Sequence, residues 1–217
     1  MDRDDRGLII PRGTTWFGSC DWGFNAPGVV LWWVHVGESH WHIFREWKFQ
    51  QTTVDDVAKG WHARNRTWRI GKVSYVAGDP SMWAKTGHSR GESIAETLIR
   101  LGVPMLKSDN DRKNGWQRCQ ELLRMAPDGR PWVTVDASCT YGRRSLPAQK
   151  SSPVDADDLD TTGDDHWVDA FRYGAMSRFC AVTGAPAKKK YGPDSAGALR
   201  DQALREERRI RRFGRVA

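Results

Sequence analysis

Hydrophobic and polar positions divide the first fifty residues into three runs that have the length and composition of strands. The runs cover 14–22, 29–36 and 40–50, and they are rich in aromatic and β-branched side chains. Residues 29–36 are continuously apolar, which indicates a buried strand, whereas 40–50 alternates in part. Glycine-containing segments at 23–27 and 37–39 supply turns, so we expect an antiparallel meander.

Helical and strand-like segments alternate after this meander. Thr53 is a favourable helix cap, and 54–68 carries apolar residues at helical spacing. Further strands are predicted at 72–77, 103–106 and 132–137, and further helices at 92–100, 111–125 and 164–182. Residues 141–162 show no convincing period, and we interpret them as a mobile loop. This order predicts an α/β fold whose mixed central sheet has its first three strands antiparallel and helices on both faces.

Two acidic residues stand where predicted strands end. Asp21 closes the first run, and Asp79 follows the strand at 72–77 in the sequence Gly78-Asp79-Pro80. Open α/β sheets place their sites at strand ends, so we expect both acids at one edge of the sheet. Taken alone, Asp21 could cap a turn, and Asp-Pro is a common turn pair.

The start of the last predicted helix adds a second group of potential ligands. At 3.6 residues per turn, Asp165, His166 and Asp169 share one face, and Asp164 precedes them. Crowded carboxylates repel one another unless a cation lies between them. The alternative is that Asp164 and Asp165 cap the helix and interact favourably with its dipole. Acidic groups that converge from three separate segments favour a metal site.

Composition restricts the class of protein. The 217 residues are 39% hydrophobic and 28% charged, which predicts one globular domain, with room for an appendage. No window approaches eighteen apolar residues, and charged residues follow Met1, so we expect neither a membrane span nor an export signal. The cysteines form no CxxC pair, which argues against a zinc site and predicts buried free thiols at Cys20, Cys119, Cys139 and Cys180.

The net charge of +7 is concentrated near the C-terminus. Residues 185–217 contain ten Lys and Arg against four Asp and Glu, which leaves 24 positive and 23 negative charges elsewhere. We therefore divide the chain into an extension or linker at 1–13, a folded domain at 14–183, and a basic tail at 184–217. The tail is expected to be partly helical, at 195–213, or disordered. It could contact phosphate or another acidic surface, or remain solvated.

Four motifs occur in order along residues 14–180. They read Asp21-Trp22-Gly23, Gly78-Asp79-Pro80, Asn110-Asp111-Arg112-x-x-Gly115-Trp116 and Asp164-Asp165-His166-x-x-Asp169-Ala170-x-Arg172-Tyr173. Together they resemble the nuclease domain of the large terminase subunit of tailed bacteriophages. The resemblance implies a ribonuclease H-like (RuvC-like) fold and an endonuclease that cuts concatemeric double-stranded viral DNA during genome packaging.

The same resemblance implies two-metal-ion phosphodiester hydrolysis. Two Mg²⁺ or Mn²⁺ ions about 4 Å apart activate water and neutralise charge on the attacking and leaving oxygens. Asp21 would bridge the ions, Asp79 would bind one, and Asp165 or Asp169 the other. Asp164 and His166 would be supporting ligands, ligand-orienting groups or a base that orients water. Candidate phosphate contacts are Lys85, His88, Arg90, Arg112, Arg143 and Arg144.

Partners and compartment follow from the resemblance. They are double-stranded DNA, the terminase ATPase motor domain, the small terminase subunit and the portal protein, in the cytoplasm of the host cell. The basic tail lies where the family often has an extension implicated in portal docking. No GxxxxGK[ST] phosphate loop occurs, so we expect no ATPase activity in this chain, which is then a fragment or a stand-alone relative. No recognition helix or zinc-finger pattern is present, which predicts low sequence specificity.

Two other functions stay open. A different ribonuclease H-like nuclease, such as a junction resolvase or a transposase core, would share the acids but prefer branched DNA. A non-catalytic packaging or DNA-binding module would keep the acids for structural reasons, and would bind DNA without metal-dependent cleavage.

Overall fold

The computed structural model describes residues 14–36, 40–85, 91–155, 158–160 and 162–178, together with the backbone of 2–3 and 9–10. The chain divides into two compact units, Met1–Phe179 and Cys180–Ala217, and everything described here belongs to the first unit. The helix predicted at 195–213 lies outside the described residues. Near the N-terminus, β1 (Asp2–Arg3) and β2 (Ile9–Ile10) pair antiparallel in a small sheet of their own.

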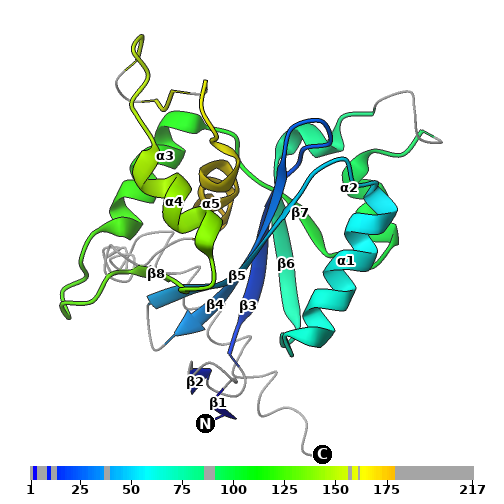
Figure 1. Cartoon of the computed structure of the whole chain (residues 1–217), viewed down its shortest axis with the longest axis horizontal. Coiled ribbons are helices and arrows are strands. Elements are labelled where there is room, and N and C mark those ends of the chain that lie inside the picture. Colours follow the sequence, from blue (N-terminus) through cyan, green and yellow to red (C-terminus); the bar gives the residue numbers. More distant parts are fainter. Residues whose placement is uncertain are drawn as a thin grey trace, which may run out of the picture. The chain divides into compact units, whose positions relative to one another are not determined.

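A six-stranded mixed sheet forms the centre of the first unit (Figure 1). Its strands are β3 (Trp16–Asp21), β4 (Gly28–Val36), β5 (His40–Phe49), β6 (Val73–Gly78), β7 (Met105–Lys107) and β8 (Val133–Val135). The spatial order is β7-β6-β3-β4-β5-β8. Strands β3, β4 and β5 are antiparallel neighbours, whereas β6 joins β3, β7 joins β6 and β8 joins β5 in parallel. The predicted α/β class and the antiparallel meander are therefore confirmed.

Helices cover both faces of this sheet. Figure 1 shows α1 (Val54–Thr67) and α2 (Ile94–Arg100) on one side, and α3 (Arg112–Leu123), α4 (Thr140–Ala148) and α5 (His166–Met176) on the other. The α1 helix begins where the sequence predicts, because the Thr53 side chain accepts a hydrogen bond from the backbone N–H of Asp56. On that side of the sheet Trp61 of α1 stacks on Trp32 of β4, with ring centroids 4.8 Å apart.

The opposite face fixes α5, which carries the acidic motif. Trp33 of β4 stacks between Phe17 of β3 and Phe171 of α5, with centroid separations of 5.3 Å to each ring. A Cβ atom at Gly174 would lie 2.6 Å from the Trp33 ring, so the absence of a side chain there lets the helix approach the sheet closely. Burial of each such side chain contributes roughly 1.5–3 kcal/mol, and these contacts set the position of α5 over β3 and β4.

One helix contradicts the sequence prediction. The segment 141–162, interpreted as a mobile loop, contains most of α4. Gly142 and Pro147 lower its intrinsic helix propensity, and its cap residue Cys139 makes no side-chain cap hydrogen bond. Glu46 of β5 supplies the cap instead, since its carboxylate accepts the backbone N–H groups of Tyr141 at 2.7 Å and Gly142 at 2.9 Å. The helix is thus stabilised by a residue far away in the sequence.

Other boundaries differ by less. The α5 helix ends at Met176 rather than near 182, because the Ser177 N–H turns back to the carbonyl of Tyr173. The polar loop predicted from residue 81 begins with a turn of 3₁₀ helix, Pro80–Trp83. Free, buried thiols are confirmed at Cys20, Cys119 and Cys139, while Cys180 lies outside the described residues. Among the described helices, none has the length and apolar character needed to span a membrane.

Candidate metal centre

Asp21 and Asp79 emerge side by side at one edge of the sheet. Cys20 of β3 pairs with Gly78 of β6 in parallel register, and each acid is the next residue along the chain. The backbone N–H of Asp79 donates to the carbonyl of Cys20 at 3.1 Å, which keeps the two strand ends together. The predicted convergence of the first two motifs is therefore present in the fold.

The N-terminus of α5 adds the third motif to this edge. His166 Nδ1 lies 3.1 Å from Asp21 Oδ2, so the first turn of the helix is hydrogen-bonded directly to the end of β3. The Asp21 side chain is only 11% exposed, against 24% for His166. A buried carboxylate and a half-buried imidazole thus form the centre of the site.

The electrostatics of the site show an excess of negative charge. Burial raises the pKa of Asp21 to about 6 against the opposing hydrogen bond from His166, and the carboxylates of Asp169 and Asp79 raise it further. Burial, followed by the charge of Asp169, also raises the pKa of Asp165. The pKa of His166 is raised chiefly by its hydrogen bond to Asp21. The charges of the acids therefore act on one another, which is the situation that a bound cation relieves.

Protein partners occupy two of these acids. Asp79 caps the turn that follows it, accepting the backbone N–H of Ser81 at 2.9 Å and its hydroxyl at 2.5 Å. Asp169 Oδ1 accepts from Arg172 at 3.0 Å (Nε) and 2.8 Å (Nη2), and Arg112 Nη1 lies 3.7 Å away. The turn-capping role that the sequence offered for Asp79 is thus present in the structure.

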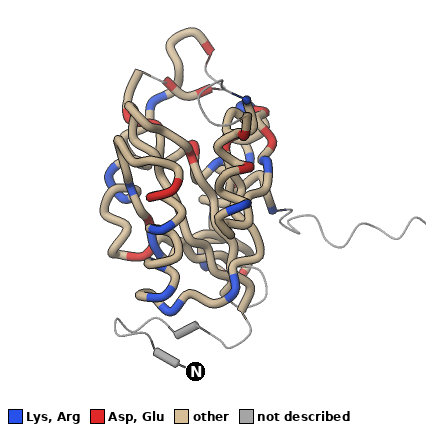
Figure 2. Tube along the Cα trace, turned by 90° about the vertical axis from the view of Figure 1, so that its right-hand side faces the viewer, with Lys and Arg blue, Asp and Glu red and all other residues tan. Residues whose placement is uncertain are grey.

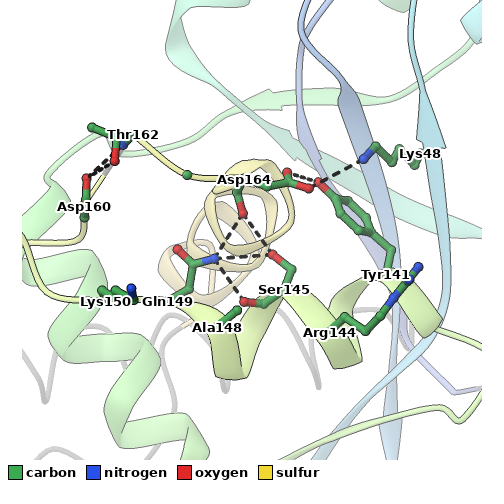
Figure 3. A pocket seen from close by; sticks show the side chains of 11 residues that line it. Lys48, Tyr141, Arg144, Ser145, Ala148, Gln149, Lys150, Asp160, Thr162 and Asp164 are labelled. Atoms are coloured by element: carbon green, nitrogen blue, oxygen red, sulfur yellow. Dashed lines mark hydrogen bonds and ion pairs between the residues drawn. The ribbon is translucent and has the colours of Figure 1, made fainter.

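Asp164 and Asp165 do not act as side-chain caps of α5. Asp165 occupies the cap position, but its side chain makes no cap hydrogen bond, so that alternative is wrong. Asp164 turns toward α4, where its carboxylate accepts from the Tyr141 hydroxyl and lies 3.6 Å from Lys48 Nζ (Figure 3). Of the two neighbours, Asp165 is the one that stays available to the metal edge.

The donor set fits a hard divalent cation. Carboxylate oxygens with one imidazole are the ligands that Mg²⁺ and Mn²⁺ accept, and the raised pKa of Asp21 reports carboxylate charge without a counter-ion. In the described part of the chain, however, no three His, Cys, Asp or Glu side chains are gathered closely enough to hold an ion. The reason is visible in the contacts: Ser81 holds Asp79, and Arg172 holds Asp169.

Comparison with known proteins gives structural matches only. No protein-family model and no curated protein matches the sequence. The fold is similar to that of a full-length large terminase from a thermophilic bacteriophage, with a TM-score of 0.62 and 18% identity over 77% of this chain and 40% of that one. The P22 large terminase nuclease domain gives 0.59 and 19%, covering 79% and 84%.

The large terminase nuclease from a thermophilic phage named G20c, with bound zinc, gives a TM-score of 0.53 at 15% identity, covering 78% of this chain and 84% of that one. A cobalt-bound structure of the same nuclease also matches. The chain has the fold of terminase nuclease domains. The ribonuclease H-like architecture implied by the motifs is thereby confirmed. The chain spans about 40% of the length of the first of these large terminases.

The residues suggested for phosphate contacts lie in different places of this terminase-like fold. Arg112 of α3 lies between Asp158, at 3.1 Å, and Asp169 of the candidate metal centre. Arg143 and Arg144 are exposed on α4, and Lys85 is exposed after the 3₁₀ turn. His88 and Arg90 lie outside the described residues. These placements leave the role of each side chain a prediction.

Sequence reasoning missed three residues next to the site. Glu46 holds α4, and its carboxylate also accepts from Trp167 Nε1 of α5 at 2.9 Å. Tyr141 contacts Asp164, and Lys48 lies over the Tyr141 ring with its ammonium 4.0 Å from the centroid. Glu46 and Lys48 are polar positions of the partly alternating run 40–50. That alternation is the one signal in the sequence that points them to the same face.

Proposed function

We propose that this chain is a metal-dependent endonuclease that hydrolyses double-stranded DNA. The observation that carries the proposal is the buried Asp21 carboxylate, hydrogen-bonded to His166 and raised in pKa by burial and by the charges of Asp169 and Asp79. The terminase nuclease fold supports the same function, as do the zinc-bound and cobalt-bound G20c nuclease structures among its neighbours. A structural acid cluster has no need for a carboxylate whose ionisation is made unfavourable.

Two Mg²⁺ or Mn²⁺ ions would supply an activated water and neutralise the charge that develops on the attacking and leaving oxygens. Asp21, at the centre of the site, is assigned as the ligand shared by both ions. Asp79 is assigned to one ion and Asp165 or Asp169 to the other. His166 engages Asp21 through Nδ1, which leaves Nε2 as the ring nitrogen that can orient a water molecule.

The biological setting is proposed from the fold and the motifs together. The substrate is concatemeric viral DNA, cut with low sequence specificity during genome packaging in the host cytoplasm. The partners are the terminase ATPase motor domain, the small terminase subunit and the portal protein. Since the chain spans only part of the length of a full large terminase, the motor function belongs to a separate domain or chain.

Plasmid cleavage tests the proposal. Wild-type protein is incubated with supercoiled plasmid in Mn²⁺, Mg²⁺ or EDTA, beside Asp21→Asn and the control Asp128→Asn. Asp128 is an exposed acid shortly before β8, at the opposite end of the sheet from Asp21. We expect metal-dependent nicking and linearisation by wild type and Asp128→Asn, and a loss of at least about 100-fold in Asp21→Asn, the size typical for a group that stabilises transition-state charge.

A non-catalytic DNA-binding module is the second candidate. It is favoured by the contacts that hold Asp79 to Ser81 and Asp169 to Arg172, which account for these acids without any metal. A well-folded wild-type chain that binds DNA but cuts no plasmid in either metal would support this function and contradict the first.

A further inference from the structure

A second candidate site lies beside the metal edge, in a cavity of about 650 Å³ next to Asp164. Figure 3 shows Asp164 at its centre, with Lys48, Tyr141 and Arg144 on one side and Lys150 on the other. The α4 helix supplies much of the wall, and residues 160–164 supply the rest. The helix that the sequence failed to predict therefore forms this cavity.

The acidic side chains of the cavity are already engaged. Asp160 Oδ1 accepts from the backbone N–H of Thr162 at 2.9 Å and from its hydroxyl at 2.7 Å. The Asp164 carboxylate accepts from Tyr141 and faces Lys48. Hydrogen bonds and an ion pair thus satisfy both acids locally.

Two basic side chains of the cavity have spare hydrogen-bonding capacity. Arg144 donates through Nε to the carbonyl of Thr140 at 3.3 Å, and Lys150 is exposed at the end of the helix. Within the described ranges, no carboxylate lies within ion-pair distance of either side chain. An anion that enters the cavity would find donors there, together with Lys48.

The sheet register relates this cavity to the metal edge. Asp21 pairs with Val29, and Val29 pairs with Lys48, so the three residues form one row across β3, β4 and β5. Residues directly opposite one another point to the same face, and two strand spacings place Lys48 roughly 10 Å from Asp21. The cavity and the metal edge thus lie on the same face of the sheet, on the side of α5.

We propose that the cavity is a phosphodiester subsite, in which Lys48, Arg144 and Lys150 hold the DNA backbone next to the cleavage point. The proposal rests on the nuclease function above. Because one strand carries a phosphate about every 3.4 Å of helix axis, a separation of roughly 10 Å corresponds to a phosphate within about three nucleotides of the scissile one. Arginine and lysine are the side chains that contact such phosphates.

The surrounding contacts keep the subsite in shape. The Tyr141 ring orients the ammonium group of Lys48. Gln149 Nε2 donates to the carbonyls of Ser145 at 3.0 Å and Asp164 at 3.1 Å, so the chain before α5 is tied to α4. An occupied subsite would place the strand relative to Asp165 through a rigid wall. It would read no bases, which agrees with the low sequence specificity predicted above.

The salt dependence of DNA binding tests this proposal. Affinity of the full chain for a fluorescein-labelled duplex is measured by anisotropy in EDTA, between about 50 and 200 mM salt. We expect Arg144→Ala/Lys150→Ala to weaken binding and to reduce the slope of log K against log salt by about 2, one unit for each lost phosphate contact. The conservative double variant Arg144→Lys/Lys150→Arg should keep the wild-type slope.

The matched control is Arg66→Ala/Lys72→Ala. It removes the same charges from exposed positions at the end of α1 and before β6, at the opposite end of the sheet from Asp79. Thermal unfolding establishes that every variant is folded. A reduction in slope equal in the two alanine double variants would overturn the subsite, because the effect would then come from net charge alone.

Plasmid cleavage by the wild-type chain separates the two proposals. If wild type cuts with metal and the Arg144/Lys150 variant binds like the control, the subsite is wrong and the nuclease function stands. If wild type binds DNA and the slope falls only in the Arg144/Lys150 variant, the subsite is supported even when no metal gives cleavage. If wild type neither binds nor cuts DNA, both proposals fail.

Discussion

At the scale of single residues, Asp21 is a carboxylate that the fold buries at the end of β3, close to the charges of Asp79 and Asp169. Its pKa of about 6 means that ionisation at neutral pH is less favourable in the folded chain than in the unfolded one. A group placed in this way reduces stability in the absence of a cation. The same carboxylate is available as a ligand when a cation binds.

We therefore expect Asp21→Asn to stabilise the metal-free protein at pH 7.5. An unfolded-state pKa of roughly 3.9 lies about two units below the folded value, so the gain is on the order of 1–3 kcal/mol. Between pH 6 and 4 the native wild type takes up a proton, its stability rises, and the advantage of the variant shrinks. Urea unfolding in EDTA across this pH range measures both effects.

Asp128→Asn is the control with the opposite sign. Hydrogen bonds from the backbone and side chain of Arg130 hold the pKa of Asp128 at about 2, so its charged form is favoured in the folded state. This variant should lose stability at neutral pH, and the wild-type contribution should disappear only as pH falls from 4 toward 2. A loss of stability in Asp21→Asn at pH 7.5 would contradict the account of that residue.

At the scale of elements, the position of α5 depends on a carboxylate two strands away from β3. Glu46 accepts the first backbone N–H groups of α4 and the indole N–H of Trp167 in α5. Gly142 lets the two helices meet, since a Cβ atom there would overlap the Trp167 ring. One side chain of β5 therefore holds both helices that border the candidate sites.

Glu46→Ala is expected to destabilise the protein by about 2–4 kcal/mol, because three buried or half-buried donors lose their acceptor. Urea unfolding measures the loss. Glu121→Ala is the matched control, since Glu121 forms an i,i+3 ion pair with Arg118 at 2.7 Å on α3 and should contribute less than about 1 kcal/mol. Equal losses in the two variants would show that Glu46 does not hold the helices.

This arrangement also explains which elements the sequence could predict. The meander and α1 depend on local signals, namely β-branched runs, turn glycines and the Thr53 cap. The α4 helix has Gly142 and Pro147 inside it and takes its cap from Glu46, so no local pattern predicts it. The acids of the metal edge were predictable because each lies at a strand end or a helix start. The subsite beside them was not, because it depends on a cross-strand row and on α4.

At the scale of the whole first unit, the two faces of the sheet have different tasks. The α1 and α2 side is a hydrophobic core, while the side of α3, α4 and α5 carries every candidate ligand that the structure brings to the sheet edge. Figure 2 shows acidic and basic residues interspersed over the described domain rather than one basic face. DNA binding by this unit then depends on local clusters of Lys and Arg, as at the proposed subsite.

The fold is shared with terminase nuclease domains at 15–19% identity, although no family model matches the sequence. A buried-strand pattern and a few acids at strand ends are enough to specify such an architecture, because many side chains of similar size can fill its core. The resemblance recognised from four short motifs is therefore easier to establish in three dimensions than along the sequence.

The most direct test of the metal centre is a crystal structure of the chain grown with Mn²⁺, with anomalous diffraction to locate the ions. The account predicts anomalous peaks beside Asp21, with Asp79 turned away from Ser81 and Asp165 or Asp169 completing the coordination. Crystals of Asp21→Asn grown in the same way should lack these peaks. Mn²⁺ absent from this edge in the wild-type crystals, with Asp79 and Asp169 still bound to Ser81 and Arg172, would contradict the account.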